Sequence, residues 1–198
     1  MGIFAQETDT TQVRFSIDFV LDYGKVLTLP SSFETKIEVA TGFTLSEKLE
    51  FIVELGYGNL TPQDVIKNGS YDSEGIYYRA GMAYGGEVVP KNYIRVGAMY
   101  GISNFDDGGI VIIRSEVWDD LAEEFHRTNL SAHWFEILIV TEQKITKHIF
   151  LGSKFRLRKL INFENDYIPE VHTIPGYGRT FDNTLPAFNL FVKYKFIF

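Results

Sequence analysis

Residues 49–58 read Leu-Glu-Phe-Ile-Val-Glu-Leu-Gly-Tyr-Gly, and they give the clearest indication of the architecture of the chain. Large apolar side chains occupy every second position, and carboxylates or glycines fill most of the positions between them. Successive side chains of a β-strand point to opposite faces of the sheet, so a period of two predicts a strand with one apolar and one polar face. The apolar set is Leu49, Phe51, Val53, Leu55 and Tyr57, and the opposite set includes Glu50, Glu54, Gly56 and Gly58.

The same alternation recurs along the whole chain. It predicts eight strands, at 13–22, 36–45, 49–58, 76–84, 93–102, 133–140, 148–158 and 187–198. Short turns follow the second, fourth and sixth strands, whereas long connections span 23–34, 59–73, 103–131 and 161–184. This arrangement is typical of outer-membrane barrels. We therefore expect an all-β, eight-stranded, antiparallel up-and-down transmembrane β-barrel with short periplasmic turns, long extracellular loops and both termini in the periplasm.

Alternation alone does not say which face points into the barrel, but three features favour charged residues inside. The strands approach the ~9–11 residues that cross a bilayer at a tilt. Glycines recur on the charged face, where a narrow interior leaves little room. Aromatic residues gather near both strand ends, at the expected headgroup levels. They are Tyr57, Tyr78, Tyr100 and Phe135 towards the long connections, and Phe43, Tyr84, Phe196 and Phe198 towards the short turns. The alternative is a soluble, lipocalin-like ligand-binding barrel, in which the two faces exchange places.

The composition limits the range of functions. A formal net charge of -7 argues against nucleic acid as a partner, because phosphate binding needs an excess of Lys and Arg. The absence of cysteine excludes disulfide frameworks and thiolate nucleophiles. No run approaches the ~18 apolar residues of a spanning helix, so a membrane protein of this sequence has to cross as a closed barrel.

The first residues differ in character from the rest of the chain. Residues 1–5 are mainly apolar and end in Ala5, and the polar residues 6–11 follow at once. This order is typical of the end of a signal peptide, with cleavage after Ala5. We expect residues 1–11 to be a signal-peptide remnant and disordered N-terminal segment, and residues 12–198 to form a single barrel domain.

The charged face predicts an interior network of ion pairs. An eight-stranded barrel is just wide enough for side chains to fill it, and isolated buried ions are very costly, so these charges must pair with one another. Such an interior is a plug and not a pore. The network is expected to contain Arg14, Asp18, Lys36, Glu38, Glu50, Glu54, Arg79, Arg95, Glu136, Lys154, Arg156 and Arg158.

The closing run, residues 188–198, resembles the C-terminal recognition strand of outer-membrane proteins. Its assembly signal consists of Tyr194, Phe196 and Phe198, although Lys193 stands where a glycine is often found. The resemblance implies handover to the barrel-assembly machinery and contact with outer-membrane lipid. Short stretches also resemble a family of uncharacterised small barrels from Bacteroidota outer membranes, which implies a fold and a location but no activity. These stretches are residues 96–103, 133–137, 151–156 and 174–178.

One short cluster resembles an enzyme site. Ser131 and His133 lie two apart and so share a face of the predicted sixth strand near the outer rim, where lipid A deacylases of the barrel type work. However, Glu136 has the opposite parity, and the Ser-x-His order does not match the His-x-Ser pattern of those deacylases. A lipid-modifying, lipid A acyl hydrolase-like enzyme is therefore an alternative to the non-enzymatic structural or accessory role that we expect.

The third long connection holds a candidate partner-docking helix. Within residues 115–126, the residues Trp118, Leu121 and Phe125 recur at helical spacing, behind Ser115 as a candidate N-cap. The apolar stripe either packs against the barrel mouth or docks an outer-membrane protein partner. Paired acids in this region lack the spacing of a calcium loop, and no glycine loop precedes a helix, so we expect neither a metal nor a cofactor.

Overall fold

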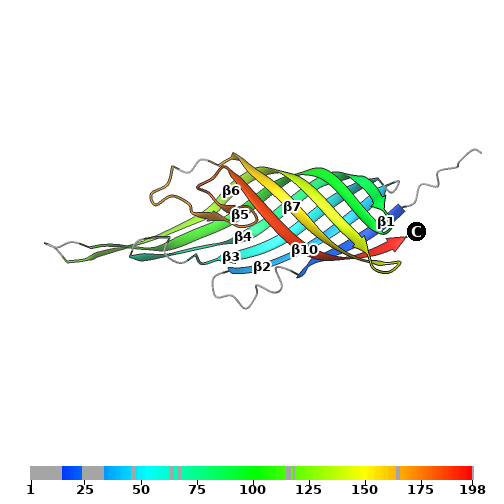
Figure 1. The fold of residues 1–198 in the computed structure, drawn as a ribbon. Coiled ribbons are helices and arrows are strands. Elements are labelled where there is room, and N and C mark those ends of the chain that lie inside the picture. The colour runs from blue at the N-terminus through cyan, green and yellow to red at the C-terminus, as the bar shows by residue number, and fades with distance from the viewer. Residues whose placement is uncertain are drawn as a thin grey trace, which may run out of the picture.

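The computed structural model describes residues 15–23, 34–45, 48–62, 65–66, 68–114, 117, 119–163 and 166–197. Eight long antiparallel strands close into a barrel in the ring order β1-β10-β7-β6-β5-β4-β3-β2 (Figure 1). This confirms the predicted fold and strand number. The barrel strands are β1 (Phe15–Asp22), β2 (Glu34–Leu45), β3 (Leu49–Leu60), β4 (Gly69–Val89), β5 (Asn92–Ile113), β6 (Leu121–Lys144), β7 (Ile149–Asn162) and β10 (Thr184–Ile197).

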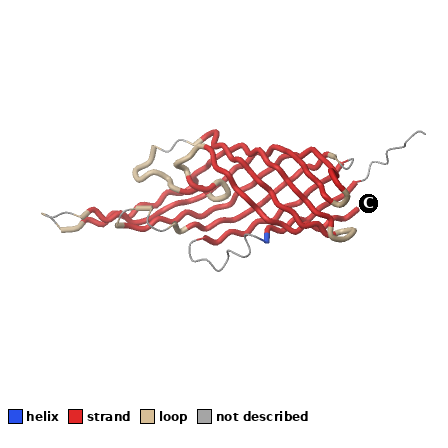
Figure 2. The backbone as a smooth tube through the Cα atoms, in the orientation of Figure 1, coloured by secondary structure: helices blue, strands red, loops and turns tan. Residues whose placement is uncertain are grey.

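The two ends of the barrel differ. Short turns join β2 to β3, β4 to β5 and β6 to β7, and all of them lie at one end, which we call the short-turn end (Figure 2). The start of β1 and the end of β10 lie at this end as well, because Ser16 pairs with Ile197. The longer connections gather at the opposite end, called the long end. No helix among the described ranges has the length and hydropathy needed to cross a membrane.

The side chains divide between the two faces as the charged-inside prediction requires. The aliphatic residues Val53 and Ile137 are 53% and 52% exposed on the outer surface, whereas Glu54, Glu136 and Arg156 are completely buried inside the barrel. Hydrocarbon can cover such an apolar exterior, while paired charges fill the interior. A soluble, lipocalin-like barrel needs the opposite assignment of the two faces, so the structure does not support that alternative.

The third long connection is mostly strand, and the helix predicted at 115–126 is wrong for the part that the structure describes. Strand β5 continues to Ile113 and β6 already begins at Leu121, so Leu121 and Phe125 lie in a strand, and Trp118 lies outside the described residues. The β-branched run at 110–113 has a strong strand preference and pairs directly with 121–124. Residues 103–113, which the sequence placed in a long connection, therefore continue the fifth strand. We call residues 107–113 and 121–127 the hairpin extension.

The fourth long connection folds back onto the mouth of the barrel. It carries a two-stranded sheet, β8 (Thr173–Ile174) and β9 (Gly178–Arg179), between β7 and β10. Gly176 has a φ of 82°, and a Cβ built there would lie 2.4 Å from the ring of Tyr77, so this turn requires glycine. The sequence predicted only a long loop here, whereas the structure shows a compact cap.

Candidate functional site

The interior of the barrel is built in layers, which follow from the order of inward-facing residues on each strand. Along β3 the buried inward positions run Glu50, Ile52, Glu54, from the short-turn end towards the long end. Along β6 the acids Glu142 and Glu136 likewise flank two buried apolar residues. The lumen therefore contains two ionic layers with an apolar layer between them.

The first ionic layer lies near the short-turn end and is called the inner cluster. Lys193 Nζ lies 2.7 Å from Glu50 Oε1 and also pairs with Glu142. Arg95 Nη1 lies 2.6 Å from Glu142 Oε2, and Asp18 Oδ2 is 3.8 Å from Lys193 Nζ. All five side chains are almost fully buried, so each charge depends on the others for solvation.

An apolar belt closes the lumen above the inner cluster. Phe191 is 1% exposed and fits against the backbone at Gly152, where an added Cβ would lie 2.3 Å from its ring. Aliphatic side chains and the Met99 thioether complete this layer, and the cations of Lys154 and Arg156 contact its Phe191 ring and its Met99 sulfur. The belt consists of Ile52, Ala83, Met99, Leu138, Val140 and Phe191, with Val20 packed against it.

The second ionic layer, called the central cluster, lies between the belt and the long end. Glu54 is its hub, with ion pairs of 2.6 Å to Arg156 Nη2, 2.8 Å to Lys154 Nζ and 2.9 Å to Arg79 Nε. Strands β3, β4 and β7 contribute these residues, so the cluster ties opposite walls of the barrel together. It contains Glu38, Glu54, Arg79, Glu136, Lys154, Arg156 and Arg158.

Glu136 forms a second hub of the central cluster. It lies 2.8 Å from Arg156 Nη1 and 3.2 Å from Arg158 Nε, and it accepts a 2.7 Å hydrogen bond from Trp134 Nε1. Arg79 pairs with Glu38, which accepts a 2.7 Å hydrogen bond from the hydroxyl of Tyr77. The aromatic donors extend the ionic layer towards the cap.

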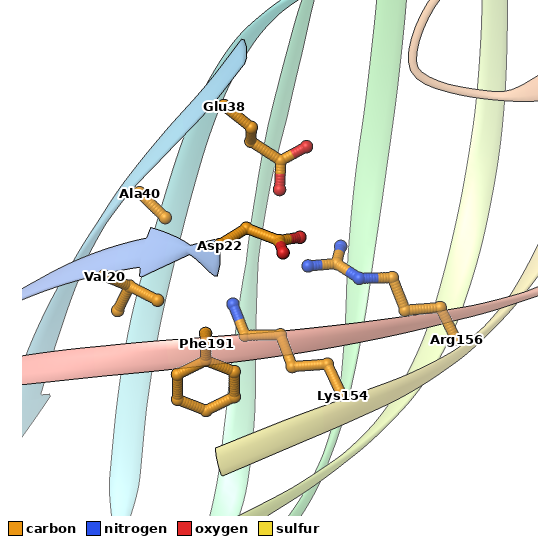
Figure 3. Close-up of a pocket in the computed structure, with 7 residues that line it drawn as sticks. All are labelled: Val20, Asp22, Glu38, Ala40, Lys154, Arg156 and Phe191. Atoms are coloured by element: carbon orange, nitrogen blue, oxygen red, sulfur yellow. The ribbon is translucent and has the colours of Figure 1, made fainter. Parts of the chain in front are cut away.

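One narrow pocket opens beside the central cluster (Figure 3). Figure 3 shows that the carboxylates of Asp22 and Glu38 and the cations of Lys154 and Arg156 point into the same space. Because both signs line it, the pocket presents no uniform field to an ionic ligand, and we assign it to the internal network. Its lining is Val20, Asp22, Glu38, Ala40, Lys154, Arg156 and Phe191.

The cap seals the long end of the lumen with an apolar core. Val171, Ile174 and Tyr177 of the fourth connection are buried against barrel residues, and the Tyr177 ring lies 5.9 Å from that of Trp134. Arg158 Nη1 donates a 2.8 Å hydrogen bond to the Tyr177 carbonyl, so the cap also rests on the central cluster. The barrel side of this core is Tyr77, Phe105, Leu130, Ala132 and Trp134.

A polar clasp fastens the cap to the hairpin extension. Asp107 is 1% exposed and accepts a 3.0 Å hydrogen bond from the hydroxyl of Tyr71 and a 2.7 Å hydrogen bond from Arg127 Nε. The same tyrosine oxygen accepts a 3.1 Å bond from the backbone N–H of His172, and Arg127 Nη1 donates a 2.7 Å bond to the carbonyl of Pro169. The extension and the cap therefore form one body.

Most of the charges predicted for the lumen are buried there. Nine of them are buried inside the barrel in ion pairs, and Arg158 is half-buried beside Glu136. Lys36 is half-buried on the inward face of β2, and Arg14 lies outside the described residues. The nine buried charges are Asp18, Glu38, Glu50, Glu54, Arg79, Arg95, Glu136, Lys154 and Arg156.

Two members of the inner cluster, Glu142 and Lys193, are not among the lumen charges predicted from the sequence. Parity could have found both, because Glu142 lies an even number of positions from Glu136 and Lys193 has the opposite parity to Tyr194 and Phe196. The clasp residues had no such signal, since Asp107 and Arg127 lie in a stretch predicted as a loop and meet only because β5 and β6 continue as a paired hairpin. Tyr194 and Phe196 are 42% exposed on the outer face of β10, and Phe198 lies outside the described residues.

The Ser131–His133 pair does not assemble with Glu136. Ser131 Oγ lies 3.4 Å from His133 Nε2, and His133 Nδ1 lies 3.0 Å from the hydroxyl of Tyr100, all on the outer surface. Glu136 is fully buried in the lumen, on the other side of the strand. A triad needs an acid or amide that orients the histidine, and here a tyrosine occupies that position. No group of three or more metal-ligating side chains is found within the described ranges.

Comparison with solved structures gives similar barrels at low sequence identity. A major outer membrane protein from Thermus thermophilus superposes with a TM-score of 0.52 at 11% identity, over 93% of this chain and 99% of that one. Neisserial surface protein A (NspA) gives a TM-score of 0.45 at 11% identity, over 92% and 96% of the two chains. No curated protein matches the sequence. The family model described as "Domain of unknown function (DUF6048)" matches residues 6–197, and the chain therefore belongs to that family.

Proposed function

We propose that this protein is a closed outer-membrane barrel with a non-enzymatic structural or accessory role, which presents its hairpin extension and cap to a protein partner outside the cell. The observation that carries the proposal is the apolar belt between two ionic layers. A pore of this diameter would need a continuous polar path, and the belt interrupts it at Phe191 and Ile52. What remains available for contact is the rigid structure at the long end.

The proposed location follows from the same features. An apolar exterior over paired interior charges suits an outer membrane, and the similar solved structures support the fold. We place the short-turn end, with both ends of the barrel sequence, in the periplasm, and the long end outside the cell. Tyr194 and Phe196, with Phe198, are the proposed signal for the barrel-assembly machinery. A Bacteroidota outer membrane is the setting that the resembling stretches suggest.

The first test concerns the closed lumen. Purified protein in a planar lipid bilayer should give no steady ionic conductance at neutral pH, because the belt excludes water. Replacing Phe191 by alanine should still leave the lumen closed, since five further residues fill the same layer. Stable single-channel steps from the unmodified protein would overturn the closed-barrel proposal.

The second test concerns the partner. Extraction from native membranes in mild detergent should recover a stoichiometric companion protein. A shortened variant replaces residues 110–124 by Asn-Gly. The new turn can close because Gly109 and Phe125 are paired across the hairpin. This variant lacks most of the hairpin extension and should release the companion. A matched exchange of Pro90-Lys91 for Asn-Gly at the short-turn end should retain it. Recovery of the barrel alone, in repeated mild extractions, would contradict the partner role.

The contact between Ser131, His133 and Tyr100 supports one competing function, modification of a lipid at the outer rim. Purified protein can be incubated with lipid A and the products analysed by mass spectrometry. We expect no change in acylation. Loss of an acyl chain that disappears with His133→Ala would replace the non-enzymatic role.

A further inference from the structure

One edge of the hairpin extension has no neighbouring strand. Residues 121–127 of β6 pair with β5 on one side, but β7 joins β6 only from His133 onward, where it pairs with Asn162. Within the described part of the chain, no strand pairs with the other edge of residues 121–126. Figure 1 shows these strands continuing well beyond the rest of the barrel. An open edge is a row of unpaired backbone N–H and C=O groups that can accept another strand.

The residues of this edge lack the commonest protection. Natural edge strands are often guarded by lysine, proline or a covering loop, and residues 121–126 contain neither lysine nor proline. Leu121 of this edge is 59% exposed, away from the lipid-covered wall. An added strand would cover this apolar side chain, which favours strand addition.

The edge is also acidic. Glu123 and Glu124 lie opposite Val111 and Ile110 of β5, so neither carboxylate has a basic partner across the hairpin. Neither forms an ion pair with any residue that the structure describes, and both are exposed. Opposite charges on directly facing strand positions stabilise a sheet, and like charges destabilise it. The edge therefore favours an incoming strand with lysine or arginine at these positions.

The same charges disfavour a second copy of this chain. If two copies paired their 121–126 edges antiparallel and in full overlap, Glu123 of one would face Glu124 of the other at both central positions. Two carboxylates would then lie side by side twice within one short ladder. A strand from a different, basic protein avoids this repulsion.

The base of the edge is held by several contacts of Arg127, which lowers the entropic cost of binding. The guanidinium of Arg127 lies between the rings of Phe125 and Tyr167, at 5.0 and 4.9 Å from their centroids. Its Nε and one Nη hold Asp107, and its other Nη holds the carbonyl of Pro169. All three nitrogens of the Arg127 guanidinium therefore donate hydrogen bonds, and the clasp fixes the direction in which β6 leaves the barrel.

We infer that the free edge of β6, residues 121–126, binds an extended basic segment of a partner protein as an additional strand of the sheet. Backbone hydrogen bonds supply affinity, and Glu123 and Glu124 select lysine or arginine at the facing positions. The inference rests on the proposed partner-binding role and names the chemistry of the partner.

The test uses the full chain in nonionic detergent and a fluorescent valine–lysine peptide of about eight residues. Its two central residues are consecutive lysines, flanked by valine and threonine, so that one lysine can face Glu123 and the other Glu124 on the opposite face of the sheet. Its binding is measured by fluorescence anisotropy. Two control peptides accompany it: one with N-methyl groups on alternate residues, which keeps every charge, and one that replaces lysine by glutamate. We expect binding of the valine–lysine peptide, and a weakening of about tenfold or more on N-methylation, because several ladder hydrogen bonds are lost. The glutamate peptide should bind more weakly still.

The matched protein variant is Glu123→Lys with Glu124→Lys, which changes two exposed side chains and leaves the barrel intact. It should lose the valine–lysine peptide and gain the valine–glutamate peptide. Equal binding of the N-methylated peptide would mean charge attraction without strand addition and would overturn the inference. Concentration-dependent dimerisation that masks the edge would overturn it in favour of a second copy.

Failure of this inference differs from failure of the proposed function. If neither peptide binds, yet native extraction still recovers a companion, the partner-binding role stands and the edge is not its site. If native extraction recovers no companion, the role itself is wrong.

Discussion

The charge of Glu54 should be among the most important single charges for the stability of the barrel. Its carboxylate is completely buried and pairs with Arg79, Lys154 and Arg156 at 2.6–2.9 Å. Glu54→Gln keeps the size of the side chain but leaves three buried cations without this partner. Breaking a buried ion pair in this way costs roughly 3–5 kcal/mol, whereas a water-exposed pair contributes about 0–1 kcal/mol. We expect Glu54→Gln to lower the free energy of unfolding by roughly 3–5 kcal/mol.

The assay is urea-induced unfolding of protein folded into lipid vesicles, followed by tryptophan fluorescence. The matched control combines Glu54→Gln with Lys154→Met, which removes one of the stranded cations and should recover part of the loss. A change below about 1 kcal/mol for Glu54→Gln alone would refute the reasoning, because it would mean that water screens the lumen charges.

Three further predictions follow from other parts of the structure. Gly56→Ala should destabilise the barrel by roughly 1–3 kcal/mol in the same unfolding assay, because the added Cβ would lie 2.1 Å from the Tyr77 ring. The control is Gly86→Ala, whose added Cβ has no neighbour within 4 Å and should have little effect. Ile137→Lys places a charge on the lipid-facing wall and should cost roughly 2–4 kcal/mol in vesicles; no loss would contradict the assignment of that face to hydrocarbon. Burial lowers the pKa of His172 below its ordinary value, so the undocked cap takes up a proton more readily than the docked one. Docking of the cap is therefore unaffected above about pH 6.5 and should weaken as the pH falls below that value. Proteolysis of the cap should become faster at low pH. His172→Gln should remove this pH dependence.

Much of the barrel could be predicted because its signal is local. Each strand carries its own alternation, and the strand lengths, the glycines of the charged face and the aromatic residues near the strand ends indicated which face lies inside. The helix predicted at 115–126 failed for a related reason. The spacing of Leu121 and Phe125 fits a helical stripe, but the two residues also share one face of a strand, and only the pairing with β5 decides between these conformations.

The clasp and the cap had no local signal. Tyr71, Asp107 and Arg127 lie far apart in the sequence and meet because β4, β5 and β6 continue as paired strands. Their hydrogen bonds to His172 and Pro169 form only when the fourth connection lies over the mouth. The free edge of β6 was equally hidden, because it depends on where β7 stops pairing rather than on any property of residues 121–126.

The period of two, the number of strands, and the separation of apolar from charged side chains are all present in the sequence, because they depend on neighbours one or two positions away. The pairing of the charges is set by the folded barrel. Lys154 reaches Glu54 across a sequence separation of 100 residues, and the apolar belt forms where inward side chains from opposite walls fall at one level. Closure and register of the sheet set those levels, and no single strand contains that information.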